Sequence, residues 1–120
     1  MKLTKTIVDD TIMFLEGTSI VLKMKEELIE NSVRITLQGE LRSELFQHFQ
    51  DELLALISVG KDLELNCRGL EYVAPSCVGV LVQVEQAVEQ SDRTMKLVEL
   101  PSAINEEFEK TGAADLLLIE

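Results

Sequence analysis

Ser76 and Cys77 are the two side chains whose type and position offer the clearest chemistry. They lie in the stretch LELNCRGLEYVAPSCVGVLVQV, which is typical of a strand, a turn at Arg68-Gly69, the segment 70–73 and a helix that begins at Pro75-Ser76. A serine at a helix N-terminus is exposed, and the helix dipole and free N–H groups stabilise negative charge there. Ser76 is therefore either a phosphate acceptor or simply the N-cap of the helix.

Cys77 is a candidate nucleophile for a small hydrolase, because a helix N-terminus lowers the pKa of a thiol. His48 is the one imidazole available as a base, and its place in another predicted helix gives no reason to put it beside Cys77. We therefore favour a packing role for Cys77 and an inert strand position for Cys67. Two cysteines and one histidine cannot complete a closed zinc site, and they make no disulfide framework, so we expect no metal and no cofactor.

The charge balance narrows the classes of partner. The 120 residues include 22 acidic side chains against 11 Lys plus Arg, which gives a net charge of −11 and a pI near 4.5. Nucleic acid and acidic lipid surfaces would be repelled, whereas a basic protein would be attracted. A hydrophobic content of 46% argues against disorder.

The N-terminal sequence predicts neither export nor membrane insertion. Acidic residues interrupt MKLTKTIVDD before an apolar core of signal-peptide length appears. No apolar run approaches the roughly 20 residues that span a bilayer. We therefore expect a protein of the reducing cytoplasm.

Residues 1–19 are predicted to form an N-terminal extension of uncertain structure, and residues 20–120 a single domain. Two short apolar runs in the extension are separated by Asp9-Asp10, which suggests two strands joined by a turn. A mobile arm that packs on a neighbouring subunit is the alternative.

Alternating apolar residues predict a β-hairpin at the start of the domain. Ile20, Leu22 and Met24 indicate one strand, and Val33, Ile35 and Leu37 indicate a second that ends at Gly39. The turn residues 30–32 leave too short a connection for a parallel crossover, so the pair is antiparallel.

The rest of the domain alternates helices with strands. Residues 43–59 have the helical period, with Ser43 as N-cap, Gly60 as the stop, and an apolar stripe of Phe46, Phe49, Leu53, Leu56 and Ile57. A strand follows at 63–67. Residues 76–90 suit a strand or a helix, and their length favours the helix. A strand at 95–100, a short helix from Pro101-Ser102 to Gly112, and a terminal strand or docked tail at 116–119 complete an α/β domain with a partly parallel sheet.

The order of these segments resembles a STAS domain, the sulfate-transporter and anti-sigma-factor-antagonist family. The resemblance covers about residues 33–120 and rests on VRITLQGELR, the Phe/Leu-striped helix, LELNCRGLEYVAPSCVGVL, TMKLVEL and FEKTGAADLLLI. It implies a mixed β-sheet backed by helices. It also implies a protein-interaction module with no enzymatic activity, in which a serine in a turn resembling Asp-Ser-Ser-Gly is phosphorylated by a partner kinase and the complex then dissociates. That serine corresponds to Ser76.

This chain departs from the family pattern around the expected phosphorylation site. Arg42 and Asn66 stand where the family often has Asp, and the Asp and Gly of the turn are Ala74 and Cys77. Three usually acidic positions are thus neutral or basic. The change is consistent with a different partner, a lost phosphorylation cycle or a scaffold role, and an Arg42 near Ser76 would neutralise a phosphate there.

Two functional hypotheses follow from the resemblance. The first is a bacterial cytoplasmic anti-sigma factor antagonist that binds an anti-sigma factor or switch kinase and so regulates transcription. The second is a constitutive adaptor or accessory subunit of a lipid or anion transporter. In both, the expected partner-binding residues are Arg42, Ser43, Pro75, Ser76, Cys77 and Gly79. Homodimerisation through the N-terminal extension is left open.

Overall fold

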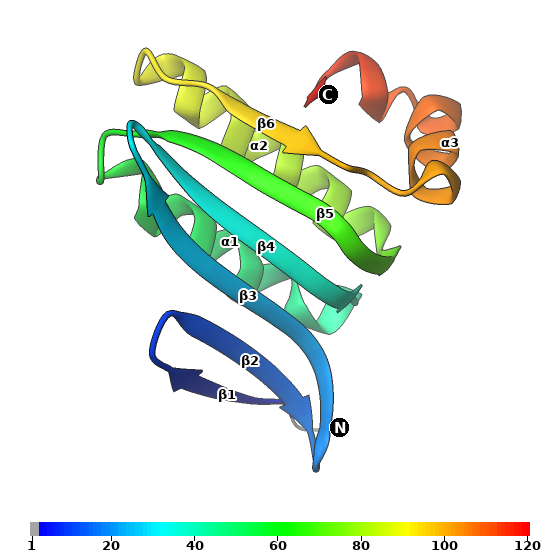
Figure 1. The fold of residues 1–120 in the computed structure, drawn as a ribbon. Helices are drawn as coiled ribbons and strands as arrows, with labels where there is room; N and C mark the ends of the chain where they lie inside the picture. Colours follow the sequence, from blue (N-terminus) through cyan, green and yellow to red (C-terminus); the bar gives the residue numbers. More distant parts are fainter. Residues whose placement is uncertain (1–2) are drawn as a thin grey trace.

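The computed structural model describes residues 3–120, so Met1 and Lys2 of the predicted N-terminal extension lie outside the described residues. These described residues form one seven-stranded sheet and three α-helices (Figure 1). The strands are β1 (Leu3–Val8), β2 (Thr11–Glu16), β3 (Ser19–Ile29), β4 (Ser32–Leu41), β5 (Asp62–Val73), β6 (Met95–Val98) and β7 (Leu118–Ile119). The helices are α1 (Phe46–Ile57), α2 (Pro75–Gln90) and α3 (Ser102–Thr111), with short 3₁₀ turns at Ser43–Leu45 and Ala113–Asp115.

The strands lie in sequence order across the sheet, antiparallel from β1 to β4 and parallel from β4 to β7. The parallel half requires crossovers, and α1, α2 and α3 supply them. Helices α1 and α2 lie side by side on one face of the sheet (Figure 1). The predicted mixed sheet backed by helices is confirmed, as are the β3–β4 hairpin and the helical state of residues 76–90.

The N-terminal strands form a hairpin that extends the sheet beside β3. Asp9 adopts a positive φ of 53° at the turn, which is the strained position of a tight connection. Phe14 on β2 is buried, and its ring centroid lies 5.5 Å from that of His48 on α1. Lys5 on β1 forms an ion pair with Glu52 on the same helix. The hairpin therefore packs against α1 and shares the core of the domain.

The start of α1 differs from the sequence prediction. A 3₁₀ turn at Ser43–Leu45 precedes the helix, and neither it nor the helix has a side-chain cap, so the prediction of Ser43 as N-cap was wrong. The tighter turn changes the register, so Leu45 is fully buried where Phe46 was expected and Phe46 is 41% exposed. Phe49, Leu53 and Leu56 are buried as predicted.

Two glycines let the central strands continue past the points where the sequence predicts an end. Gly39 does not end β4, and Arg68-Gly69 is not a turn but part of β5; both predictions were wrong. The β4–β5 register shifts between Thr36 and Gln38 and again between Gly39 and Glu40, which is the signature of bulges. A Cβ at Gly39 would lie 2.2 Å from the carbonyl oxygen of Val21, and its φ is +116°. Glycine is thus required by both contact and conformation.

Gly39→Ala is expected to lower the free energy of unfolding by about 3 kcal/mol, because the backbone must shift to relieve the clash. Gly79→Ala is the matched control, since a Cβ there meets nothing within 4 Å and α2 gains a better helix former. Urea denaturation of both variants measures the difference. Equal stability of Gly39→Ala and the parent chain would contradict the close approach.

Glu85 on α2 offers a pH-dependent test of the packing. Its Oε2 atom is buried without a hydrogen-bond partner. Burial is the largest cause that raises the pKa of Glu85, and the Glu89 carboxylate raises it further, while a hydrogen bond with the Leu118 backbone lowers it. Because the pKa is higher in the folded chain, folding is penalised where Glu85 is ionised, and the penalty disappears as pH falls below its ordinary value of 4.5. Glu85→Gln should therefore raise the melting temperature at pH 7, by an amount that shrinks toward pH 4. Glu106→Gln, on the exposed side of α3, should show no such trend.

Candidate partner-binding surface

The start of α2 is determined by the ends of the two central strands. Strand β5 ends at Val73, and the Ala74 N–H then donates to the Leu41 carbonyl oxygen at 2.8 Å. Ala74, with φ −67° and ψ 150°, is the N-cap, and Pro75 occupies the first helical position, where a missing N–H costs nothing. Ser76 is therefore the exposed second residue of α2. The interpretation of Ser76 as the N-cap of this helix was wrong.

Cys77 is fully buried beneath the helix start. Its Sγ donates to the Arg42 carbonyl oxygen at 3.5 Å, which joins α2 to the end of β4. Burial raises the pKa of the Cys77 thiol to about 11, with a smaller lowering from the Ser76 hydrogen bond and a smaller rise from the Glu44 carboxylate. Burial likewise raises the pKa of Cys67 to about 12. Desolvation thus exceeds any lowering by the helix N-terminus, and both thiols have packing roles.

The 3₁₀ turn before α1 lies beside the start of α2 and adds an acidic residue that sequence reasoning missed. Ser43 is exposed, and its hydroxyl donates to Glu44 at 3.1 Å. Hydrogen bonds from the Glu44 backbone and then from Ser43 lower the pKa of the Glu44 carboxyl, so it is charged at neutral pH. The turn that contains Ser43 is separated from α2 by some thirty residues of sequence, so the family resemblance, and no local pattern, predicted that they lie close together.

An apolar groove of about 380 Å³ opens between the first turn of α2 and α3. We call it the proximal groove; it is lined by Tyr72, Val73, Pro75, Val78, Glu107, Phe108 and Thr111. Tyr72 is 45% exposed and presents an aromatic ring with a polar tip, a combination that is enriched at interfaces. The sequence predicts the helix that contains Phe108 but gives no reason to join it to Tyr72, because only the tertiary structure brings α3 to this edge.

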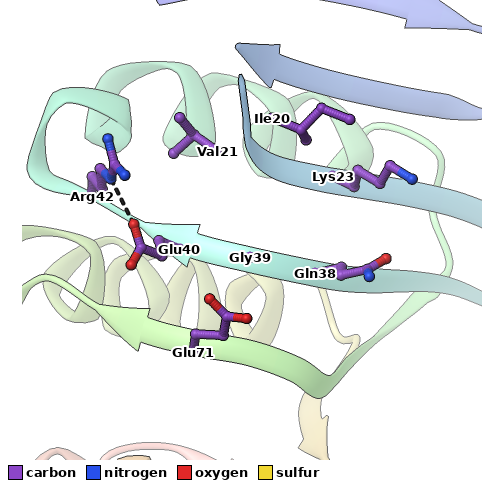
Figure 2. Close-up of a pocket in the computed structure, with 8 residues that line it drawn as sticks. All are labelled: Ile20, Val21, Lys23, Gln38, Gly39, Glu40, Arg42 and Glu71. Atoms are coloured by element: carbon purple, nitrogen blue, oxygen red, sulfur yellow. Dashed lines mark hydrogen bonds and ion pairs between the residues drawn. The ribbon is translucent and has the colours of Figure 1, made fainter. Parts of the chain in front are cut away.

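Arg42 does not line this groove. Its Nε donates to Glu40 at 2.7 Å and its Nη1 to Glu16 at 3.0 Å, so the guanidinium is shared by two carboxylates. Arg42 and Glu40 line a separate hollow of about 410 Å³ with Ile20, Val21, Lys23, Gln38, Gly39 and Glu71 (Figure 2). The structure therefore divides the predicted site: Ser43, Pro75, Ser76 and Gly79 are exposed around the start of α2, Cys77 is buried, and the Arg42 side chain belongs to the hollow.

Asn66, which stands where an acidic residue was expected, has a local structural role. Its Nδ2 donates to Glu99 at 2.7 Å, and its Oδ1 accepts from the Arg68 N–H at 3.0 Å. These bonds brace the bulge in β5. Across residues 3–120, no cluster of three His, Cys, Asp or Glu side chains is arranged to hold a metal ion. The helices in this same range lack the combined length and apolar character needed to traverse a bilayer.

Comparisons with known proteins agree with this architecture. Similar solved structures include TM1081 from Thermotoga maritima, with 16% identity and a TM-score of 0.72 over 80% of this chain and 84% of that one. They include the anti-sigma factor antagonist SpoIIAA, with 17% identity and a TM-score of 0.63 over 81% of this chain and 86% of that one, and the Bacillus protein has also been solved in a phosphorylated form. The murine anion transporter Slc26a9 matches with 14% identity and a TM-score of 0.63 over 96% of this chain, which is 20% of the transporter.

A search of curated proteins found no match. The structural likenesses, at these low identities, establish the fold alone. The family evidence comes from the sequence: residues 24–120 match the family model described as "Mlab, STAS domain". The match includes both central strands, α1, α2 and α3. The chain therefore belongs to the STAS domain family.

Proposed function

We propose that this chain is a non-enzymatic regulatory module of the bacterial cytoplasm that binds a protein partner through the surface around the start of α2. The supporting observation is that the first turn of α2 exposes Ser76 and also contributes Pro75 and Val78 to the lining of the proximal groove. By similarity to the anti-sigma factor antagonists, the partner is an anti-sigma factor or switch kinase, and the consequence of binding is regulation of transcription. A basic partner fits a chain with net charge −11.

Phosphorylation of Ser76 would act as the switch. A phosphate adds a charge of about −1.5 to −2 and three hydrogen-bond acceptors to the rim of an apolar interface. Glu44 already places a carboxylate near the start of α2, and Arg42 is already paired with Glu40 and Glu16. A new phosphate would therefore gain little local compensation from Arg42 and would oppose docking through desolvation and repulsion.

A constitutive adaptor of a lipid or anion transporter is the second candidate. The observation in its favour is that the same fold is found within the murine anion transporter Slc26a9. Arg42, Asn66 and Ala74 stand where the family often has Asp, and this absence of acidic residues also suits an interface that is not regulated by a kinase. In that case the proximal groove would stay occupied whatever residue stands at position 76.

The Ser76→Asp variant distinguishes the two candidates. In affinity capture from the native host, it should recover the partner at least about tenfold less well than the parent chain, whereas Ser76→Ala should retain binding. Ser102→Asp places the same charge at the exposed start of α3 and is the matched control. Full binding by Ser76→Asp, together with no phosphate on Ser76 by mass spectrometry of host protein, would favour the constitutive adaptor.

Thiol reactivity tests the non-enzymatic part of the proposal. Because Cys77 is fully buried with a pKa near 11 and Cys67 has a pKa near 12, both thiols should react at pH 7.5 about 100-fold more slowly than in the chain unfolded by guanidinium. Peptide mapping after timed labelling identifies each cysteine. Rapid labelling of Cys77 in the folded chain would revive the nucleophile hypothesis.

A further inference from the structure

A second groove lies at the opposite end of the sheet from the start of α2. We call it the distal groove; it measures about 310 Å³ and is lined by Asp10, Glu26, Glu27, Leu28, Val33, Leu56 and Val59. It is formed where the β1–β2 turn, the β3–β4 hairpin and the end of α1 meet. Figure 1 shows the β3–β4 turn and the start of α2 at opposite ends of the central strands. The proximal and distal grooves are therefore separate surfaces.

The floor of the distal groove is an uncovered part of the core-facing side of the sheet. Leu22 and Met24 on β3 are fully buried, and Leu28 continues the same alternation of side chains along the strand. Leu28 is nevertheless 72% exposed, and Val59 is 47% exposed. The reason is that α1 ends at Ile57 and does not cover this end of the sheet. An apolar side chain in this position lacks the packing partner that its neighbours along the strand have.

The rim of the distal groove is acidic. Glu26 lies between Met24 and Leu28 on the core-facing side and is partly buried. Burial is the largest cause that raises the pKa of Glu26, and the Glu52 carboxylate raises it further, while Lys5 lowers it. Lys5, however, forms its ion pair with Glu52, and within residues 3–120 Glu26 takes part in no salt bridge. A cation brought from outside would therefore compensate a carboxylate that the fold leaves unmatched.

We propose that the distal groove binds a basic amphipathic segment of a partner protein. An apolar side chain of the segment would pack between Leu28 and Val59, and an adjacent Lys or Arg would pair with Glu26 and Asp10. A second copy of this chain fits less well, because two acidic rims and two net charges of −11 would be brought together. This inference does not depend on the proposed role of Ser76.

The test uses two synthetic amphipathic peptides of equal length, one built from Leu and Lys and one from Leu and Glu. Each is titrated into the full ¹⁵N-labelled chain and followed by NMR. The Leu/Lys peptide should shift the amide signals of Asp10, Leu28 and Val59 in a salt-dependent manner, and the Leu/Glu peptide should not.

Matched variants separate the apolar and electrostatic contributions. Leu28→Ser should weaken binding of the Leu/Lys peptide about tenfold, because one largely buried leucine contact is lost. Leu116→Ser, which replaces a leucine that is also exposed, should have no effect. Glu26→Gln should reduce both affinity and salt dependence, and Glu106→Gln should change neither at the distal groove. Because Leu28 is exposed, Leu28→Ser should keep the fold, and thermal melting checks this; Val59→Ser is the substitute if it does not.

Three results would overturn the proposal. The first is a set of shifts confined to the proximal groove around Tyr72 and Val78. The second is unchanged affinity of a folded Leu28→Ser chain. The third is a dimer of the parent chain in sedimentation that Leu28→Ser converts to a monomer, which would assign the distal groove to a second copy.

Discussion

The close pairing of β4 with β5 is the constraint on which the proposed partner-binding surface depends. The β4–β5 register shifts twice, and β5 carries the extra residue each time. Glycines allow the close approach of the backbones here: a Cβ at Gly69 would meet the Leu37 carbonyl oxygen on β4 at 3.0 Å, and one at Gly39 would meet the Val21 carbonyl oxygen on β3 at 2.2 Å. The bulges allow the two strands to end together at Leu41 and Val73. The Ala74 N–H can then bond to Leu41, and this bond determines where α2 begins and which residues its first turn presents.

The first turn of α2 joins a buried anchor to an exposed hydroxyl. Cys77 turns inward and bonds to the Arg42 carbonyl oxygen, so the preceding residue, Ser76, must face solvent on a helix with a 100° rotation per residue. This geometry explains why Ser76 and Cys77, which are neighbours in the sequence, differ in exposure to solvent. The thiol is desolvated and has a raised pKa, whereas the hydroxyl stays exposed to solvent.

Acidic residues rim both grooves, so the basic partner proposed for each would meet charges of opposite sign. Glu107 lines the proximal groove, with Glu44 near the start of α2, while Asp10 and Glu26 line the distal groove. In each case an apolar floor supplies contact area and carboxylates at the edge favour a basic segment. The two surfaces lie at opposite ends of the sheet, which would let one small domain contact two segments at once.

Much of the architecture follows from local pattern. The two-residue alternation identified β3 and β4 because it reflects burial of one face, and Gly112 marked the end of α3. For α2, whose valines also alternate as in a strand, the length of residues 76–90 favoured the helix. The errors arose where glycine serves a contact between strands rather than a turn, and where a 3₁₀ turn placed Leu45 rather than Phe46 in the core. Those outcomes depend on neighbours that are distant in sequence.

The sequence by itself determined the order of strands and helices, the STAS family and the position of Ser76 at a helix start. These features depend on side-chain periodicity and on residues within a few positions of one another. The tertiary structure alone decided that the Cys77 thiol meets the Arg42 carbonyl oxygen, that the Arg42 side chain pairs with Glu40 and Glu16, and that Tyr72 and Phe108 share a groove. Each of these depends on segments that meet only after the sheet has formed, and no local pattern encodes the distance between them.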